Sequence, residues 1–315
     1  MFRYIFFLIL ILSINFFDNF FFKQTSVEKS KTIFIGVGMG LDEISNLLYS
    51  NKIIHNKLAF KIWVKINSYE KKLKFGEYDF DGFLTIPKVS KKLLLGESIY
   101  RKLTIIEGSS KYDFLNTLKK IDKKSKITVA KIPDNIIADT YTYQLTDNAE
   151  KIVKDIYKLS SNQAELMWKN RDFNVLLKDM SEMFTLASIV EKETHNKKEK
   201  KIVAGVFFNR LEKKMRLQSD PTVEFSITKG KEKLGRTLKK SDLKFNSEYN
   251  TYKNHGFPPS PICFPGLDSL NSVVNPMKTN FLYFVANELN QGHLFSTNYD
   301  GHLKNIRDLK RLKKK

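Results

Sequence analysis

The longest apolar run of the chain lies at its N-terminus, at residues 2–22 (FRYIFFLILILSINFFDNFFF). As a helix this run would be about 31 Å long, close to the ~30 Å hydrocarbon core of a bilayer. Arg3 lies at the start of the run, before its continuously apolar part, which favours an N-terminus inside the cell. A cleaved signal peptide is the competing interpretation, but no small-x-small cleavage pattern follows Phe22. We therefore expect an uncleaved anchor at 1–22 that places the rest of the chain outside the cytoplasm, and a remainder that folds without it.

A weak repeat of strand, glycine and short amphipathic helix follows this run. Its three copies begin at the strand-like segments Thr32–Val37, Tyr78–Phe83 and Leu103–Ile106, each with apolar residues at helical spacing behind it. Small units of this kind bury one sheet face and leave other surface free to bind. The pattern predicts an α+β fold for this part of the chain.

Three apolar stripes at helical spacing come next, at 152–177, 183–190 and 202–211. From Leu217 to Gly266 the many prolines, glycines and polar residues predict long, structured loops, which in compact proteins are usually functional. Residues 280–286 and 293–297 predict two strands joined by a turn at Gly292. The basic tail 304–315 is typical of a solvated helix end.

Composition removes several classes of protein. With 42% hydrophobic and 13% aromatic residues, the chain can bury a core and is not disordered as a whole. The net charge of +20 favours an anionic partner, yet only eight of the 54 basic residues are arginine, so we expect no nucleic acid. One cysteine, Cys263, allows neither an internal disulfide nor a cysteine zinc site, and the five histidines lack metal-ligand spacing. We expect no metal and no cofactor.

Two carboxylates end the second apolar stripe, in the segment ASIVEKET at 187–194. On a helix, Glu191 and Glu193 project about 200° apart, so they cannot both face one site. One should point to solvent or a basic neighbour, and the other could lie at the mouth of an apolar pocket. Desolvation there would raise its pKa and suit it to general acid catalysis. A capped, solvated helix end fits the same spacing.

A second polar group occupies MRLQSDPT at 215–222 and YNTY at 249–252. The amides, hydroxyls, carboxylate and aromatic rings gathered here are the mixture that binds sugars. The candidate ligands are Gln218, Asp220, Thr222, Asn250 and Tyr252. The alternative is a self-capping loop in which Asp220 caps a turn begun by Pro221.

These segments carry a resemblance to a known family. ASIVEKET, VFFNRL, MRLQSDPTV, YNTY, GFPPSPICFPG and YFVA occur in the order and approximate spacing seen in the YceG-like endolytic murein transglycosylases, and KFGEY, LTIIEG and ADTY fit earlier in the chain. The resemblance implies an anchor at 1–22, a LysM-like α+β region at 23–100 and an α+β catalytic domain at 101–315. It implies Glu193 as the catalytic residue and Glu191 as a supporting one. Glu224 departs from the family pattern, and its role stays open.

The activity that the resemblance implies is cleavage of the bond between N-acetylmuramic acid and N-acetylglucosamine within peptidoglycan strands, leaving a 1,6-anhydro end. The implied setting is the cell inner membrane, with a single pass and the catalytic part in the periplasm. Penicillin-binding synthases and other elongation or division proteins are the candidate partners. The residues alone leave three alternatives: a non-catalytic glycan-binding scaffold, a muramidase that adds water, and, from charge only, a nucleic-acid binder.

Overall fold

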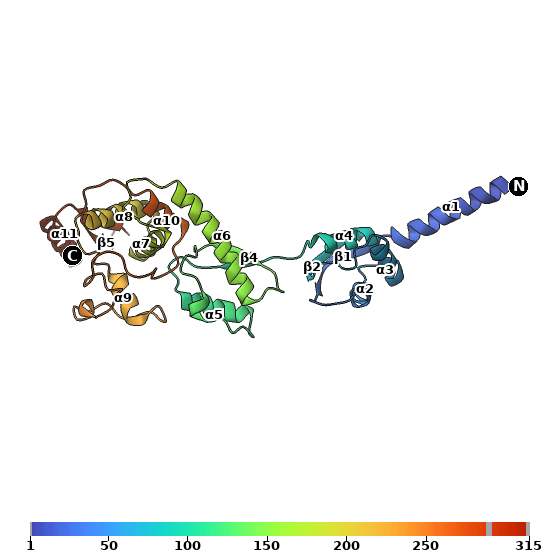
Figure 1. The fold of residues 1–315 in the computed structure, drawn as a ribbon, viewed down its shortest axis with the longest axis horizontal. Coiled ribbons are helices and arrows are strands. Elements are labelled where there is room, and N and C mark those ends of the chain that lie inside the picture. Colours follow the sequence, from blue (N-terminus) through green and yellow to red (C-terminus); the bar gives the residue numbers. More distant parts are fainter. Residues whose placement is uncertain (1, 288–291, 313–315) are drawn as a thin grey trace. The chain divides into compact units, whose positions relative to one another are not determined.

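The computed structural model describes residues 2–287 and 292–312, and these divide into two compact units. The first unit holds the chain up to Lys102 together with 142–147, and the second holds 103–141 and the residues from 148 onward. The chain crosses between the units in the two strands of a small sheet, β3 (Arg101–Thr104) and β4 (Thr140–Tyr143) (Figure 1). Each unit is described here by itself.

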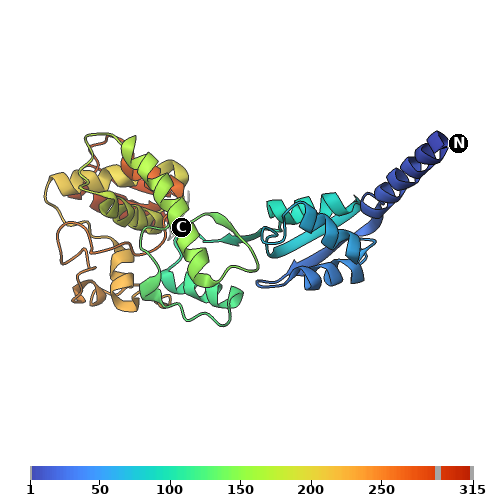
Figure 2. The ribbon, with the colours of Figure 1, turned by 45° about the vertical axis from the view of Figure 1, so that its right-hand side comes forward.

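The first unit is built on a long antiparallel pair of strands packed with short helices. Its elements are α1 (Phe2–Phe21), β1 (Thr25–Ile35), α2 (Leu41–Ser50), α3 (Lys57–Ile66), β2 (Gly76–Leu84) and α4 (Ile86–Leu95). β1 pairs with β2 from Thr25 opposite Leu84 to Ile35 opposite Gly76, with a shift in register between Val27 and Lys31. Tyr78 and Phe80 of β2 are completely buried, so one face of the strand pair contributes to the core beneath the helices. Figure 2 shows the short helices packed around the two strands.

The helix α1 is apolar over its whole length. Residues Arg3–Phe21 have a mean hydropathy of 1.9, and nearly all of their side chains are exposed. The helix is long and apolar enough to cross a membrane, and it fits a transmembrane helix. Its last turn behaves differently, because Phe21 is only 5% exposed and belongs to the core of the first unit. The end of the apolar helix and the folded unit therefore share side-chain contacts.

The second unit is mostly helical. Its elements are α5 (Lys111–Ile121), the 3-10 turn η1 (Val129–Lys131), α6 (Ala149–Lys169), α7 (Met180–Glu193), α8 (Lys197–Glu212), α9 (Asp220–Thr228), the 3-10 turn η2 (Asp242–Lys244), α10 (Leu267–Val274), β5 (Tyr283–Asn287), β6 (Gly292–Ser296) and α11 (Tyr299–Leu312). β5 and β6 form an antiparallel pair, with Asn287 opposite Gly292. The whole chain is thus a mixed α and β protein with one N-terminal apolar helix.

The helix α7 lies at the centre of the second unit. Every residue from Met183 to Glu191 is buried, because α6, α8, α9 and α10 all pack against this helix. The sequence pattern predicted one core-facing stripe here, but the helix is buried all round. The chain at Met277 passes close to Gly205 of the neighbouring helix α8. A Cβ atom on Gly205 would lie 2.4 Å from the Met277 carbonyl oxygen. Glycine at 205 permits this approach.

Several predicted elements differ in extent. The helix expected to run to Leu177 ends at Lys169, and the amide of Asp172 donates to the Val274 carbonyl oxygen at 2.9 Å. Residues 217–266 are not loops throughout, because α9 starts at Asp220. Pro221 is tolerated in its first turn, where a backbone N–H would have no partner within the helix. The helices α3 and α10 had no counterpart in the prediction. Gly292, the predicted turn residue, begins β6. Residues 288–291 before it, and 313–315 of the tail, lie outside the described residues.

Candidate active site

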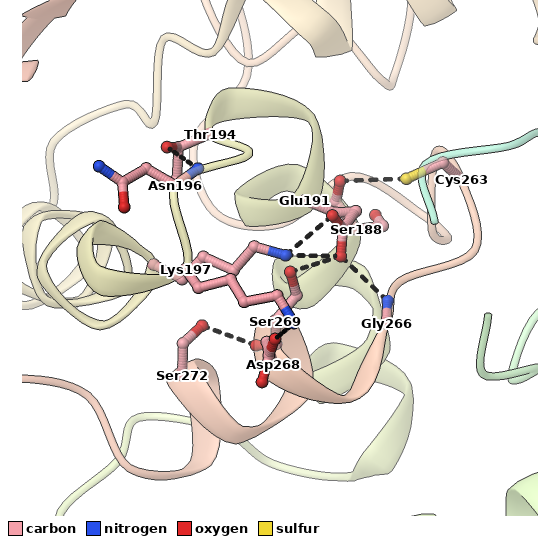
Figure 3. A network of polar contacts seen from close by, with 11 residues as sticks. Ser188, Glu191, Thr194, Asn196, Lys197, Cys263, Gly266, Asp268, Ser269 and Ser272 are labelled. Atoms are coloured by element: carbon pink, nitrogen blue, oxygen red, sulfur yellow. Dashed lines mark hydrogen bonds and ion pairs between the residues drawn. The ribbon is translucent and has the colours of Figure 1, made fainter. Parts of the chain in front are cut away.

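The two carboxylates of the EKET segment lie at the last turn of α7 and face different partners. Glu191 points into the protein, and its carboxylate accepts from Lys200 Nζ at 2.9 and 3.1 Å. Both side chains are 2% exposed. The Gly266 amide and the Ser269 hydroxyl also donate to this carboxylate, at 3.0 and 2.6 Å from Glu191 Oε2 (Figure 3). Glu191 thus ties the end of α7 to the first turn of α8 and the start of α10.

Glu193 lies two residues further on and points to the other side of the helix. It is half-buried, and the hydroxyl of Ser219 donates to its Oε1 at 2.5 Å. Desolvation raises the pKa of the Glu193 carboxyl to about 7, and the negative charge of Asp220 adds to the rise. The Ser219 hydrogen bond and the positive charge of Arg210 oppose it. This carboxyl therefore exchanges its proton near neutral pH.

The helix α7 ends at this point because Thr194 adopts an extended conformation, with its amide still bonded to the Val190 carbonyl oxygen at 3.2 Å. Asn196 then caps α8 by accepting from the Lys198 amide at 3.1 Å. The corner is three residues long, so the buried pair on one side and Glu193 on the other are held by the same rigid turn. This corner therefore limits the positions that the Glu193 side chain can adopt.

Ser219 is positioned by buried threonines. Its amide donates to Thr251 Oγ1 at 2.9 Å, and its carbonyl oxygen accepts from Thr222 Oγ1 at 2.7 Å. The two threonine hydroxyls lie 2.8 Å apart. Asn250 is also completely buried, and its amide nitrogen donates to the carbonyl oxygens of Leu243 and Phe245 at 3.0 and 2.7 Å. Thr222 and Asn250, both predicted from the sequence as sugar ligands, therefore have protein partners and face inward.

The other predicted ligands reach the surface. Asp220 is exposed and Tyr252 half-exposed, and the Tyr252 hydroxyl donates to Asp220 Oδ1 at 2.6 Å. Desolvation, with the hydrogen bond to Asp220 and the charges of Asp220 and Glu193, raises the pKa of the Tyr252 phenol above its usual value. Gln218 is exposed, its backbone is left-handed with φ of 51°, and its side chain has no hydrogen bond within the described ranges. Asp220 and Tyr252 therefore lie close enough to Glu193 for their charges to interact, and Gln218 is exposed next to Ser219.

Two residues near Glu193 were not found from the sequence. Ser219 sits between two predicted ligands, but nothing in the pattern links it to a carboxylate 26 positions away. Arg210 is buried on α8, donates to the carbonyl oxygens of Leu217 and Leu282 at 2.6 and 2.7 Å, and lies 5.2 Å from the Tyr283 ring centre. The position of Arg210 inside an apolar stripe was the one sequence feature that could have indicated a buried basic residue. Its hydrogen bonds fix the segment that leads into Ser219.

A groove of about 540 Å³ runs beside the end of α7. Lys192, His195, Pro221 and Glu224 line it together with the segment 106–110. Glu224 Oε1 accepts from the Leu234 amide at 3.1 Å, so this carboxylate has a partner in the protein. Within residues 2–287 and 292–312, no group of three or more His, Cys, Asp or Glu side chains is arranged to hold a metal ion.

Comparison with known proteins places the chain in a family. The profile of the YceG-like family matches residues 33–308. An endolytic murein transglycosylase of Bacillus subtilis is 31% identical over 297 residues, covering 82% of this chain and 81% of that protein. One of Streptococcus pneumoniae is 26% identical over 330 residues, and the chain spans 58% of its length. The crystal structure of a yceG-like protein from Listeria monocytogenes matches with a TM-score of 0.51 and 27% identity, over 88% of this chain and 99% of that one. The chain belongs to the YceG-like family.

Proposed function

We propose that this chain is an endolytic murein transglycosylase, a lyase that cuts peptidoglycan strands internally between N-acetylmuramic acid and N-acetylglucosamine. Its curated relatives carry that name. The observation that carries the chemistry is the half-buried carboxyl of Glu193, whose pKa is raised to about 7 beside exposed groups suited to sugars. A carboxyl with that pKa is partly protonated at neutral pH, as a general acid must be.

In the proposed reaction Glu193 acts twice. Protonated, it donates to the glycosidic oxygen as the bond from that oxygen to the muramic acid C1 breaks. The carboxylate then accepts the proton of the muramic acid 6-hydroxyl, whose oxygen bonds to C1 and closes the 1,6-anhydro ring. No water is consumed and Glu193 ends protonated, so the second carboxylate of an ordinary glycosidase is not needed.

The neighbouring residues have proposed roles that follow from their burial. The charge of Asp220 acts on Glu193, and we assign the Asp220 carboxylate, held by Tyr252, to the positive charge that develops at C1. The exposed amide of Gln218 is assigned to sugar hydroxyls. Thr222 holds the segment that carries Ser219, Asn250 holds the loop at 243–252, and Glu191 holds the end of α7.

The two units take different proposed roles. The second unit carries the reaction, and we assign the first unit to the LysM-like region that holds glycan near the membrane. With α1 as a single-pass anchor, both units would work on the outer side of the inner membrane, where nascent strands are made. Penicillin-binding synthases and other elongation or division proteins are the proposed partners there.

The test is mass spectrometry of glycan fragments after incubation of peptidoglycan with the purified chain. Anhydro-ended internal fragments are expected from the natural protein and from Glu224→Gln, and none from Glu193→Gln. Reducing ends would instead make the protein a muramidase, and binding without cleavage would make it a scaffold. An active Glu193→Gln with an inactive Glu224→Gln would move the acid to Glu224.

A further inference from the structure

The helix α3 is fastened to the end of α1. The rings of Phe21 and Phe22 lie 5.4 and 5.7 Å from the Trp63 ring, centre to centre. His55, just before α3, donates from Nε2 to the Phe20 carbonyl oxygen at 3.1 Å. The position of α3 is therefore set by the place where α1 ends.

That place is a membrane surface if α1 spans the bilayer. The 20 residues of α1 give a helix of about 30 Å, equal to the hydrocarbon core. Phe21 and Phe22 then reach the interface on the far side, and Trp63 touches them there. Tryptophan favours this depth because its ring is apolar and its N–H is polar.

One face of α3 carries an apolar row that is exposed at both of its ends. Leu58, Ile62 and Ile66 follow one another at intervals of four, so they form a single row along the helix. Leu58 is 57% exposed and Ile66 71% exposed, while Ile62 between them is half-buried and packs in part against the core. Phe60 and Val64 on the opposite face are completely buried. The core of the unit thus uses one side of α3 and leaves an apolar row on the other.

A row of lysines runs beside the apolar row. Lys57, Lys61 and Lys65 each precede one of its members by a single residue, so they lie about 100° round the helix, on the side away from Trp63. Lys61 pairs with the exposed Asp42 at 2.7 Å, and Lys65 lies 4.0 Å from Glu70. An apolar row flanked by lysines is the pattern of a helix that lies in a membrane surface.

We propose that α3 lies in the bilayer surface from which α1 emerges, with Leu58, Ile62 and Ile66 at the acyl-chain boundary and the lysines among anionic headgroups. Trp63 contacts Phe21 and Phe22 at the end of α1 and lies one helical turn from Ile66 of this row, which is why a lipid surface is its occupant. Phe83 is 65% exposed and pairs with Ser26, five residues past α1, so further apolar surface lies at the same end of the unit. The inference rests on α1 as an anchor and is independent of the chemistry at Glu193.

The test uses the full chain in phospholipid vesicles that contain phosphatidylglycerol. Single variants Leu58→Cys and Ile66→Cys carry a nitroxide, and Cys263 is buried and does not compete for the label. Leu95→Cys is the matched control, because Leu95 is 51% exposed. Lys74 Nζ donates to its carbonyl oxygen, so it lies at the Gly76 end of the strand pair, away from α1. Collisions with oxygen, which concentrates in lipid, are compared with collisions with a water-soluble nickel chelate.

We expect oxygen to collide more often than the chelate at positions 58 and 66, and the reverse at 95. Replacing phosphatidylglycerol by phosphatidylcholine should reduce the difference at 58 and 66, since the lysines then lose their anionic partners. Chelate access at 58 and 66 equal to that at 95 would overturn the proposal. So would labels shielded from both reagents with dipolar broadening between them, because a second copy of the chain would then cover the row.

Discussion

Two isosteric substitutions two residues apart should change the stability of the second unit in opposite directions. Glu193→Gln removes a carboxyl whose ionised form is destabilised by burial, whereas Glu191→Gln removes one partner of a buried ion pair. Both replacements keep the shape of the side chain and an oxygen that can accept hydrogen bonds. The sign of the effect therefore isolates the electrostatic environment of each carboxylate.

For Glu193 the cost follows from the pKa, which is about 7 in the folded chain against a usual value of 4.5. Below pH 4.5 the group is protonated in both the folded and the unfolded state and costs nothing. As pH rises from 4.5 towards 7, the unfolded state loses its proton first and folding becomes less favourable. Above about 7 the group is ionised in both states and the cost stays constant. Each tenfold change in the ionisation constant is worth about 1.4 kcal/mol, so the cost is about 3 kcal/mol at pH 8 and under about 1 kcal/mol at pH 5. Glu193→Gln should be more stable than the natural chain by these amounts.

Glu191→Gln should destabilise at both pH values. It leaves the Lys200 ammonium, 2% exposed, without its counter-charge. Removing one partner of a buried pair costs about 3–5 kcal/mol, since the remaining charge is desolvated without compensation. The hydrogen bonds from the Gly266 amide and Ser269 can still be accepted by the glutamine oxygen, so the loss arises from the charge.

The measurement is urea unfolding in mild detergent at pH 5 and pH 8. The chain has two tryptophans, and Trp168 packs on the core of the second unit. A Trp63→Phe background makes Trp168 fluorescence report on that unit alone. Equal stability of Glu193→Gln and the natural chain at pH 8 would refute the desolvated state of Glu193. A Glu191→Gln variant as stable as the natural chain would refute the buried pair.

Three further predictions follow from single contacts. Activity should fall as pH rises through about 7, because the acid form of Glu193 is required. Ser219→Ala removes a hydrogen bond that lowers the pKa of Glu193, so in a pH–rate profile this fall should move to higher pH. Gly205→Ala should lower the free energy of unfolding by about 1–3 kcal/mol in the Trp168 assay, because its Cβ would collide with the Met277 carbonyl oxygen. A fragment without residues 1–22 should fold but unfold its first unit at lower urea, by Trp63 fluorescence, than one that starts at Phe20, because it lacks the buried Phe21.

The divergence of the two glutamates could be predicted from the sequence because it depends only on helical geometry. At 100° per residue, positions 191 and 193 must face different surroundings, and the structure gives one of them a buried lysine. Which surroundings each receives depends on Ser219, Ser269 and Gly266, which reach the end of α7 from distant segments. No local pattern encodes those meetings, because they are set by how α8, α9 and α10 pack.

The segment around Pro221 shows why local signals were misread. Asp-Pro is typical of a turn, and the surrounding glycines and prolines favour a loop. The same dipeptide opens α9, since proline is well tolerated in a first helical turn. What decides between the two is the buried cluster of Thr222 and Thr251, which anchors the first turn. Such a contact, 29 residues apart in the chain, is visible only after folding.

The balance of forces on Glu193 bears on why one carboxyl can serve both halves of the proposed reaction. Burial and the Asp220 charge raise its pKa, and Ser219 and Arg210 restrain that rise. A much higher pKa would make the acid reluctant to donate to the glycosidic oxygen, and a much lower one would make the carboxylate a poor acceptor for the 6-hydroxyl proton. A value near 7 leaves the two transfers comparably easy at neutral pH. The restraining groups are therefore as much a part of the proposed catalyst as the burial, and a variant that removes either restraint should impair donation more than acceptance.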